Sequence, residues 1–192
     1  MNHCVWSKHI AFWAVVGLVL LTIPVTARAQ FEKEPVMTAL LYNVARFVTW
    51  PEGSFADQDA PLVIALQGDG PLQQAIASLS GKQIEGRTIM IQRLASNQLP
   101  DRHQPCHILY IPQSPSQTLT NTMEAVAGQP ILTVSDMQDF SRKGGILHLE
   151  GAQNVSFSLN LDSAQKAGLV LSSKLFRLAN LVIKDGQERE GP

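Results

Sequence analysis

Between residues 62 and 134 two hydrophobic patterns alternate along the chain, and this alternation restricts the possible folds more than any other feature. A helix face at three- and four-residue spacing lies in residues 72–79, and Ser114-Pro115 begins a second helix that extends to residue 127. Because strands that alternate with helices form α/β domains, we expect a sheet that is at least partly parallel. The strands are predicted from short apolar runs at residues 62–66, 88–91, 106–111 and 131–134.

Residues 146–160 add the pattern of a hairpin. Polar and apolar residues alternate on both sides of a turn at residues 151–154, as they do in strands with two different faces. Two antiparallel strands beside the parallel ones would make the sheet mixed. We therefore expect an α/β fold, a single-domain three-layer sandwich in which helices flank a mixed sheet.

Helices are also expected at both ends of this domain. One begins near Pro35, ends at Trp50-Pro51 and presents an apolar face made of Met37, Leu40, Leu41, Val44, Phe47 and Val48. The other is a closing amphipathic helix, whose apolar face consists of Leu171, Leu175, Leu178, Ala179 and Val182. The polar residues 185–192 are expected to form a frayed, flexible tail after an α/β domain of residues 30–184.

The first 29 residues have the features of a secretory signal peptide. Lys8 precedes an uninterrupted apolar stretch at residues 11–25, and the small residues Ala27 and Ala29 fit the Ala-x-Ala cleavage rule. The apolar stretch is shorter than the ~20 residues that a membrane span needs. We therefore expect cleavage after Ala29 and export of the remaining chain.

Charge and cysteine content limit the functions that the exported chain can have. The whole chain carries 15 Lys and Arg residues against 16 Asp and Glu residues, so no basic face for nucleic acid is expected. Once the leader is removed, Cys106 is the only cysteine and cannot form an internal disulfide. We interpret it as a small buried apolar residue, although pairing with a second protomer stays open.

The sequence contains no recognisable catalytic or metal-binding motif. Gly-x-Ser-x-Gly, His-Glu-x-x-His and Cys-His nucleophile patterns are absent, so we expect no enzymatic activity and no cofactor. His103, Cys106, His107 and His148 could be considered as metal ligands. However, Cys106 and His107 are neighbours on a predicted strand and point to opposite faces, so we interpret the histidines as surface or edge residues.

Two turns at strand ends form an alternative site for a small ligand. Gly68, Asp69 and Gly70 follow a predicted strand and precede a helix, and Ser135 and Asp136 follow another strand. Open α/β sheets often bind ligands at such positions. Because no complete phosphate-binding pattern is present, a plain tight turn at Gly68–Gly70 is the simpler interpretation.

Two groups of residues are candidates for contact with a partner protein. Large aromatic side chains beside arginine are typical of binding hot spots, although aromatic side chains also anchor helices to cores. The first group lies at the end of the first helix, and the second lies on the predicted closing helix. The candidates are Phe47, Trp50 and Phe55 in the first group, and Lys174, Phe176 and Arg177 in the second.

Several blocks of sequence together resemble the YfiR-like family of bacterial periplasmic regulators. They are LLYNVARFVTWP at 40–51, PLVIALQGDGPL at 61–72, CHILYI at 106–111, ILTVSDMQDFSRKGGILHLE at 131–150 and VSFSLNLDSAQKAGLVLSSKLFRLA at 155–179. The resemblance implies a periplasmic repressor, often a homodimer, that performs no catalysis. Its implied partners are the periplasmic sensor domain of an inner-membrane diguanylate cyclase and an outer-membrane OmpA-like lipoprotein. Such a repressor lowers cyclic di-GMP and biofilm formation. The characterised repressor carries disulfides, whereas this chain keeps only Cys106.

Overall fold

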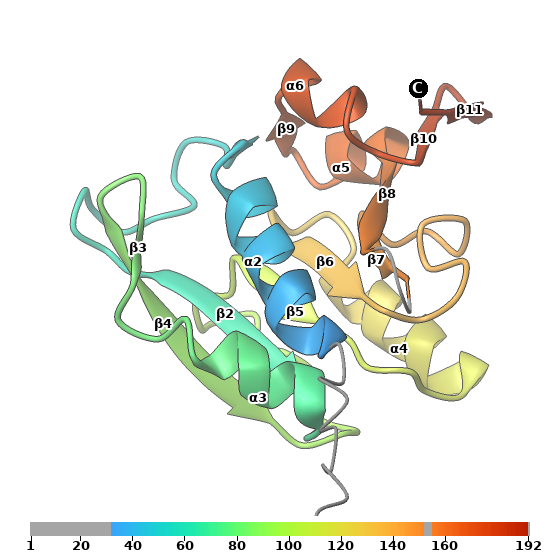
Figure 1. The fold of residues 1–192 in the computed structure, drawn as a ribbon. Coiled ribbons are helices and arrows are strands. Elements are labelled where there is room, and N and C mark those ends of the chain that lie inside the picture. Colours follow the sequence, from blue (N-terminus) through green and yellow to red (C-terminus); the bar gives the residue numbers. More distant parts are fainter. Residues whose placement is uncertain (1–31, 152–154, 192) are drawn as a thin grey trace, which may run out of the picture. The chain divides into compact units, whose positions relative to one another are not determined.

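The computed structural model describes residues 32–151 and 155–191 (Figure 1). The expected signal peptide with its cleavage site, and residues 152–154 in the hairpin turn, lie outside the described residues. Among the described residues, no helix is both long enough and apolar enough to cross a membrane.

Nine strands within the described residues form one mixed sheet, in the order β11-β10-β8-β7-β6-β5-β2-β4-β3. The five strands from β4 to β7 in this order are parallel, whereas β8 pairs antiparallel with β7. This β7–β8 pair is the predicted hairpin. In sheet order, the strands are Gln187–Glu190, Leu181–Lys184, Ser156–Asn160, Leu147–Glu150, Leu132–Ser135, Ile108–Tyr110, Leu62–Gln67, Arg87–Leu94 and Gln83–Ile84.

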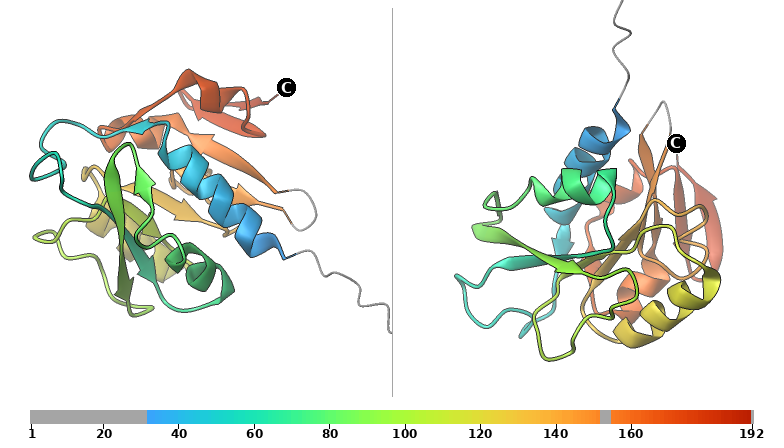
Figure 2. Two further views of the ribbon diagram at one scale, coloured as in Figure 1. Left: turned by 60° about the vertical axis from the view of Figure 1, so that its left-hand side comes forward. Right: turned by 90° about the horizontal axis from the view of Figure 1, so that it is seen from below.

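Helices cover both faces of the sheet, which confirms the predicted three-layer sandwich. Helices α2 (Lys33–Ala45) and α3 (Pro71–Ala77) lie on one side of the strands and α4 (Ser116–Val126) on the other (Figure 2). Each face has its own hydrophobic cluster. In β2, Ile64 packs on the α2 side and Ala65 on the α4 side. Because β2 is buried on both faces, its sequence is a continuous apolar run.

The predicted helix face over residues 171–182 is wrong. The segment instead contains strand β9 (Val170–Leu171), the short helix α6 (Ser173–Phe176) and then strand β10. Ser172 caps the N-terminus of α6. After α6 ends, the Asn180 N–H donates to the Phe157 carbonyl, and this bond brings the chain to the edge of the sheet. The apolar residues spaced by three and four therefore lie in β9, in α6, in the connection after α6 and in β10.

The expected frayed tail is also corrected, because residues 187–190 form β11, which pairs antiparallel with β10. Asp185 and Gly186 connect these strands with positive φ angles of 54° and 68°, the conformation of a tight two-residue hairpin turn. The Asp162 carboxylate accepts hydrogen bonds from both of their N–H groups, each at 2.8 Å. Asp162 belongs to α5 (Leu161–Lys166), a short helix that the sequence analysis did not identify.

The first helix is shorter than predicted. It ends at Ala45, and Val48–Thr49 forms strand β1, which pairs antiparallel with β9 in a separate two-stranded sheet. Phe47 and Val48 therefore leave the helix face on which the sequence pattern placed them. The pairing of β1 with β9 brings an early and a late part of the chain together at one surface.

Candidate functional site

The two-stranded sheet carries an exposed apolar surface. Val48 pairs with Leu171 and Thr49 with Val170, and the Ser172 N–H donates to the Phe47 carbonyl at 2.9 Å. Val48 and Leu171 point into the core. Because side chains alternate along strands, Phe47, Thr49 and Val170 share the outward face. Val170 is 64% exposed and Phe47 is 37% exposed.

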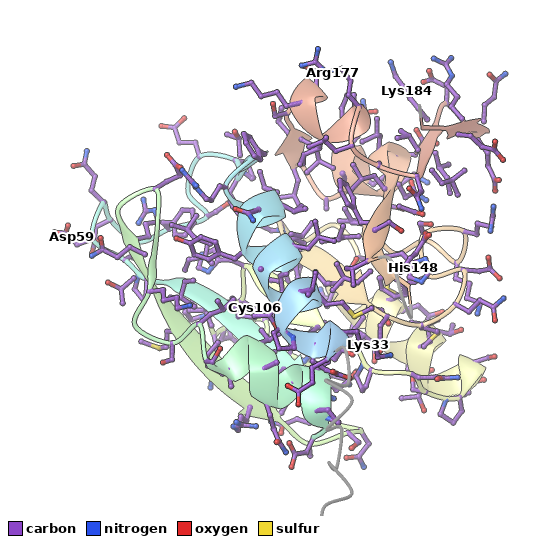
Figure 3. The ribbon with its side chains drawn as sticks, in the orientation of Figure 1. Lys33, Asp59, Cys106, His148, Arg177 and Lys184 are labelled. Carbon is purple, nitrogen blue, oxygen red and sulfur yellow. The ribbon has the colours of Figure 1, made fainter. Side chains whose placement is uncertain are left out.

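Positive charge accompanies these apolar residues. The Lys174 Nζ atom lies 5.8 Å from the centre of the Phe47 ring, within the range of a cation–π contact. We call the surface formed by Phe47, Thr49, Val170 and Lys174 the β1–β9 face. Arg177 extends outward just after α6 (Figure 3) and is followed by Leu178, which is 66% exposed. Within residues 32–151 and 155–191, neither Lys174 nor Arg177 forms an ion pair.

Next to this face, three rings form what we call the aromatic clamp, namely Trp50, Phe55 and His107. Phe55 stacks on His107 with ring centres 4.2 Å apart and an angle of 9° between the ring planes. Trp50 meets both rings edge-on at 6.1 and 6.3 Å, and its Nε1–H donates to the His107 carbonyl at 3.3 Å. The clamp therefore attaches the segment after β1 to the start of β5.

Both ring nitrogens of His107 have backbone partners. Nδ1 accepts the N–H of Val63 at 3.0 Å, so Nε2 carries the proton and donates to the Ser54 carbonyl at 2.9 Å. Burial lowers the pKa of His107, which favours this neutral form. The interpretation of His107 as a surface or edge residue is therefore wrong, since its exposure is only 3%.

Arg87 completes the clamp from strand β4. Its guanidinium lies 3.8 Å from the centre of the Phe55 ring, on which His107 also stacks. Its Nη1 donates to the carbonyls of Asp57 and Ala60 at 2.9 and 2.7 Å. Arg87 thus fixes the loop between β1 and β2, a role that no sequence pattern predicted.

A largely apolar cavity of about 460 Å³ lies against the clamp and strand β1. Trp50, Phe55 and Arg87 contribute to its wall, and Val48 and Thr49 also line it. Thr49 is the one residue that this lining shares with the β1–β9 face. The cavity therefore borders the face at Thr49.

The structure separates the six candidate partner-binding residues into different roles. Phe47 and Lys174 meet on the β1–β9 face, and Arg177 is exposed nearby in sequence. Trp50 and Phe55 are half-buried in the clamp and line the cavity. Phe176 is half-buried and packs against the main core. Val170 and Leu178 are also exposed but were not predicted as candidates for partner contact. The sequence pattern assigned Leu178 to a buried helix face.

The alternative ligand residues are not brought into one site. Gly68, at φ 72°, and Gly70 form a tight turn in which the Asp69 carboxylate accepts the Gly70 N–H at 3.0 Å. The Ser135 hydroxyl accepts the Met137 N–H at 3.0 Å. Asp136 instead accepts the Tyr110 hydroxyl at 2.7 Å and lines a separate polar cavity to which Gly68–Gly70 do not contribute.

Cys106 is a free, half-buried thiol at the start of the β5 segment. Burial raises its pKa to about 12, so the thiol stays protonated and is a poor nucleophile. It packs against the α4 side of the sheet, whereas His107 joins the clamp. In the described part of the chain, no three His, Cys, Asp or Glu side chains are arranged to hold a metal ion.

Comparison with known proteins identifies the family of this fold. The YfiR/HmsC-like family model matches residues 34–180, a range that includes β1, β9, α6 and the aromatic clamp. No curated protein matches the chain. Because the matched range covers well over half of the 192 residues, the chain belongs to the YfiR/HmsC-like family.

Proposed function

We propose that this protein is a periplasmic, non-enzymatic regulator that binds the periplasmic sensor domain of an inner-membrane diguanylate cyclase and holds the cyclase inactive. Membership of the YfiR/HmsC-like family supports this proposal. The observation that carries it is the β1–β9 face, where exposed Phe47 and Val170 lie beside Lys174. The consequence in the cell is less cyclic di-GMP and less biofilm.

The β1–β9 face has the composition of a binding hot spot. Aromatic and arginine side chains supply much of the binding energy in protein interfaces, and surrounding contacts exclude water from them. Phe47 provides an aromatic ring and Lys174 provides a cation. Arg177, which lies outside this face just after α6, adds a second cation, and neither cation has an ion-pair partner in the described residues. A partner surface with acidic groups around an apolar centre would complement these residues.

Repression by contact requires a difference between two binding free energies. The regulator must bind the inactive cyclase more tightly than the active one, and a tenfold preference corresponds to about 1.4 kcal/mol. An OmpA-like lipoprotein that covers the same face would relieve repression by competition. Both partners, together with the homodimer implied by the family resemblance, belong to this proposal.

The most enzyme-like cluster supports a non-enzymatic function. The Glu150 carboxylate lies between the Ser158 hydroxyl and His148, whose Nδ1 is 3.2 Å from it. Activation of a serine nucleophile needs the histidine next to the hydroxyl and the carboxylate behind the histidine. Here the Ser158 hydroxyl donates to Glu150 instead, and in the described residues no hydrogen bond joins it to His148.

Deletion of the gene tests the proposed function. We expect cyclic di-GMP and biofilm mass to rise, because the cyclase is no longer held in its inactive state. Expression of the wild-type protein with its leader should return both to their original levels. Unchanged cyclic di-GMP in the deletion strain under biofilm-forming conditions would contradict the proposal.

A further inference from the structure

The polar face of the β7–β8 hairpin is buried. Ser135, His148 and Ser158 lie side by side across β6, β7 and β8, because Ser135 pairs with His148 and His148 pairs with Ser158. Ser135 and Ser158 are at most 1% exposed, and the His148 side chain is 11% exposed. Apolar side chains usually fill such positions, so a buried polar row calls for a specific explanation.

A cavity of about 370 Å³ lies over His148 and Ser158. Residues from five separate parts of the chain line it, and the 136–142 segment after β6 supplies several of them. Lys33 comes from the first turn of α2 and His148 from β7 (Figure 3). The charged or ionisable residues of the lining are Lys33, Asp136, Asp139, Arg142, His148 and Glu150.

Glu150 has only neutral partners inside this cavity. Its Oε1 atom accepts a hydrogen bond from the Ser158 hydroxyl and lies 3.2 Å from His148 Nδ1. Burial lowers the pKa of His148, so the ring is neutral at pH 7.5. A neutral imidazole keeps one ring nitrogen as a hydrogen-bond acceptor. Within residues 32–151 and 155–191, no positively charged side chain forms an ion pair with Glu150.

Asp136 is in a similar position, because its partner is the neutral hydroxyl of Tyr110 at 2.7 Å. The lining contains two cations, of which Arg142 is already engaged. Its guanidinium contacts Asp139 at 2.6 Å and both carboxylate oxygens of Glu188 at 2.8 and 3.0 Å. The other cation is Lys33, so the three carboxylates of the lining exceed its cations by one charge. The carboxylates of Asp136 and Glu150 and the neutral imidazole of His148 can accept hydrogen bonds from a ligand.

We propose that this cavity binds a small organic ammonium compound between Asp136, His148 and Glu150. An ammonium group donates up to three hydrogen bonds, and its charge balances the one carboxylate by which the lining exceeds its cations. Its volume of about 370 Å³ is at the small end of the range for ligand sites. A metal ion fits less well, since no group of three or more His, Cys, Asp or Glu in the described residues could hold one.

Calorimetric titration of the purified chain without its leader, at pH 7.5 in moderate salt, tests this site. Butane-1,4-diamine is the probe, and butane-1,4-diol and succinate are neutral and anionic controls of the same chain length. We expect saturable binding of the diamine only. Glu150→Gln keeps the shape of the side chain but removes its charge, and should weaken diamine binding at least tenfold.

Two further variants make the result specific. Asp136→Asn should weaken binding in the same way, and it serves as the test if Glu150→Gln does not fold. Glu124→Gln on α4 also removes a carboxylate but lies outside the cavity lining, so it should bind the diamine like the wild type. The proposal is overturned by absence of saturable diamine binding, by equal binding of the diol, or by equal loss in Glu124→Gln.

Discussion

At the scale of single residues, the aromatic clamp depends on one neutral histidine. The two-residue period of residues 106–111 correctly placed Cys106 and His107 on opposite faces of a strand. The burial of His107 was not predicted, because its partners Ser54 and Val63 are 53 and 44 residues away in the sequence. The continuous apolar run around His107 was the available signal that it would be buried.

Two histidines with lowered pKa values, His107 in the clamp and His148 on β7, predict that stability depends on pH. The pKa values of His107 and His148 in the folded state lie below the ordinary value of 6.5, which the unfolded chain keeps. At a pH between the folded-state and unfolded-state values, the unfolded chain therefore binds more protons than the folded chain. Their contribution to stability is complete above pH 6.5 and decreases as the pH falls below it. We expect urea denaturation to give a smaller free energy of unfolding at pH 5.0 than at pH 7.5.

The variant His107→Gln identifies the source of this dependence. It lacks the titrating ring, so its free energy of unfolding should change less between pH 7.5 and pH 5.0 than that of the wild type. It should also be less stable at pH 7.5, because the stacking on Phe55 is lost. An equal pH dependence in the two proteins would show that His107 does not contribute.

At the scale of elements, the two hairpin strands were predicted, whereas the periodic helix face over residues 171–182 and the shortest elements were not. The hairpin strands around residues 147–160 have a clear two-residue period. In contrast, β1 and β9 contain two residues each, which is too short for any periodic signal. The β10–β11 turn was predictable, since Asp-Gly between two strands is a strong hairpin signal. It was not predicted because the residues of β11 are polar and lack the alternation of a strand.

Removal of residues 187–192 tests whether β11 is structural. The truncated protein loses the β10–β11 pairing and the contact between Arg142 and Glu188. We expect a lower melting temperature, by about 2–4 °C for every kcal/mol lost in a domain of this size. Calorimetry on both proteins measures the difference, and an unchanged melting temperature would support the frayed tail expected from composition.

At the scale of the whole molecule, the alternation of strands and helices was sufficient to predict the three layers. It did not predict the sheet order, because pairing between distant strands leaves no local pattern. The same limit applies to the candidate surface. Phe47 and Lys174 were both named from composition, but only the pairing of β1 with β9 brings them within 5.8 Å.

Complementation of the deletion strain tests the central claim, which is repression through contact at the β1–β9 face. The double variant Phe47→Ala/Lys174→Glu removes the ring and reverses the charge, and Lys82→Glu is a control at an exposed lysine outside this face. Equal periplasmic amounts and melting temperatures are confirmed first. We predict that Lys82→Glu restores low cyclic di-GMP and that the double variant does not. Full restoration by the double variant would contradict the account.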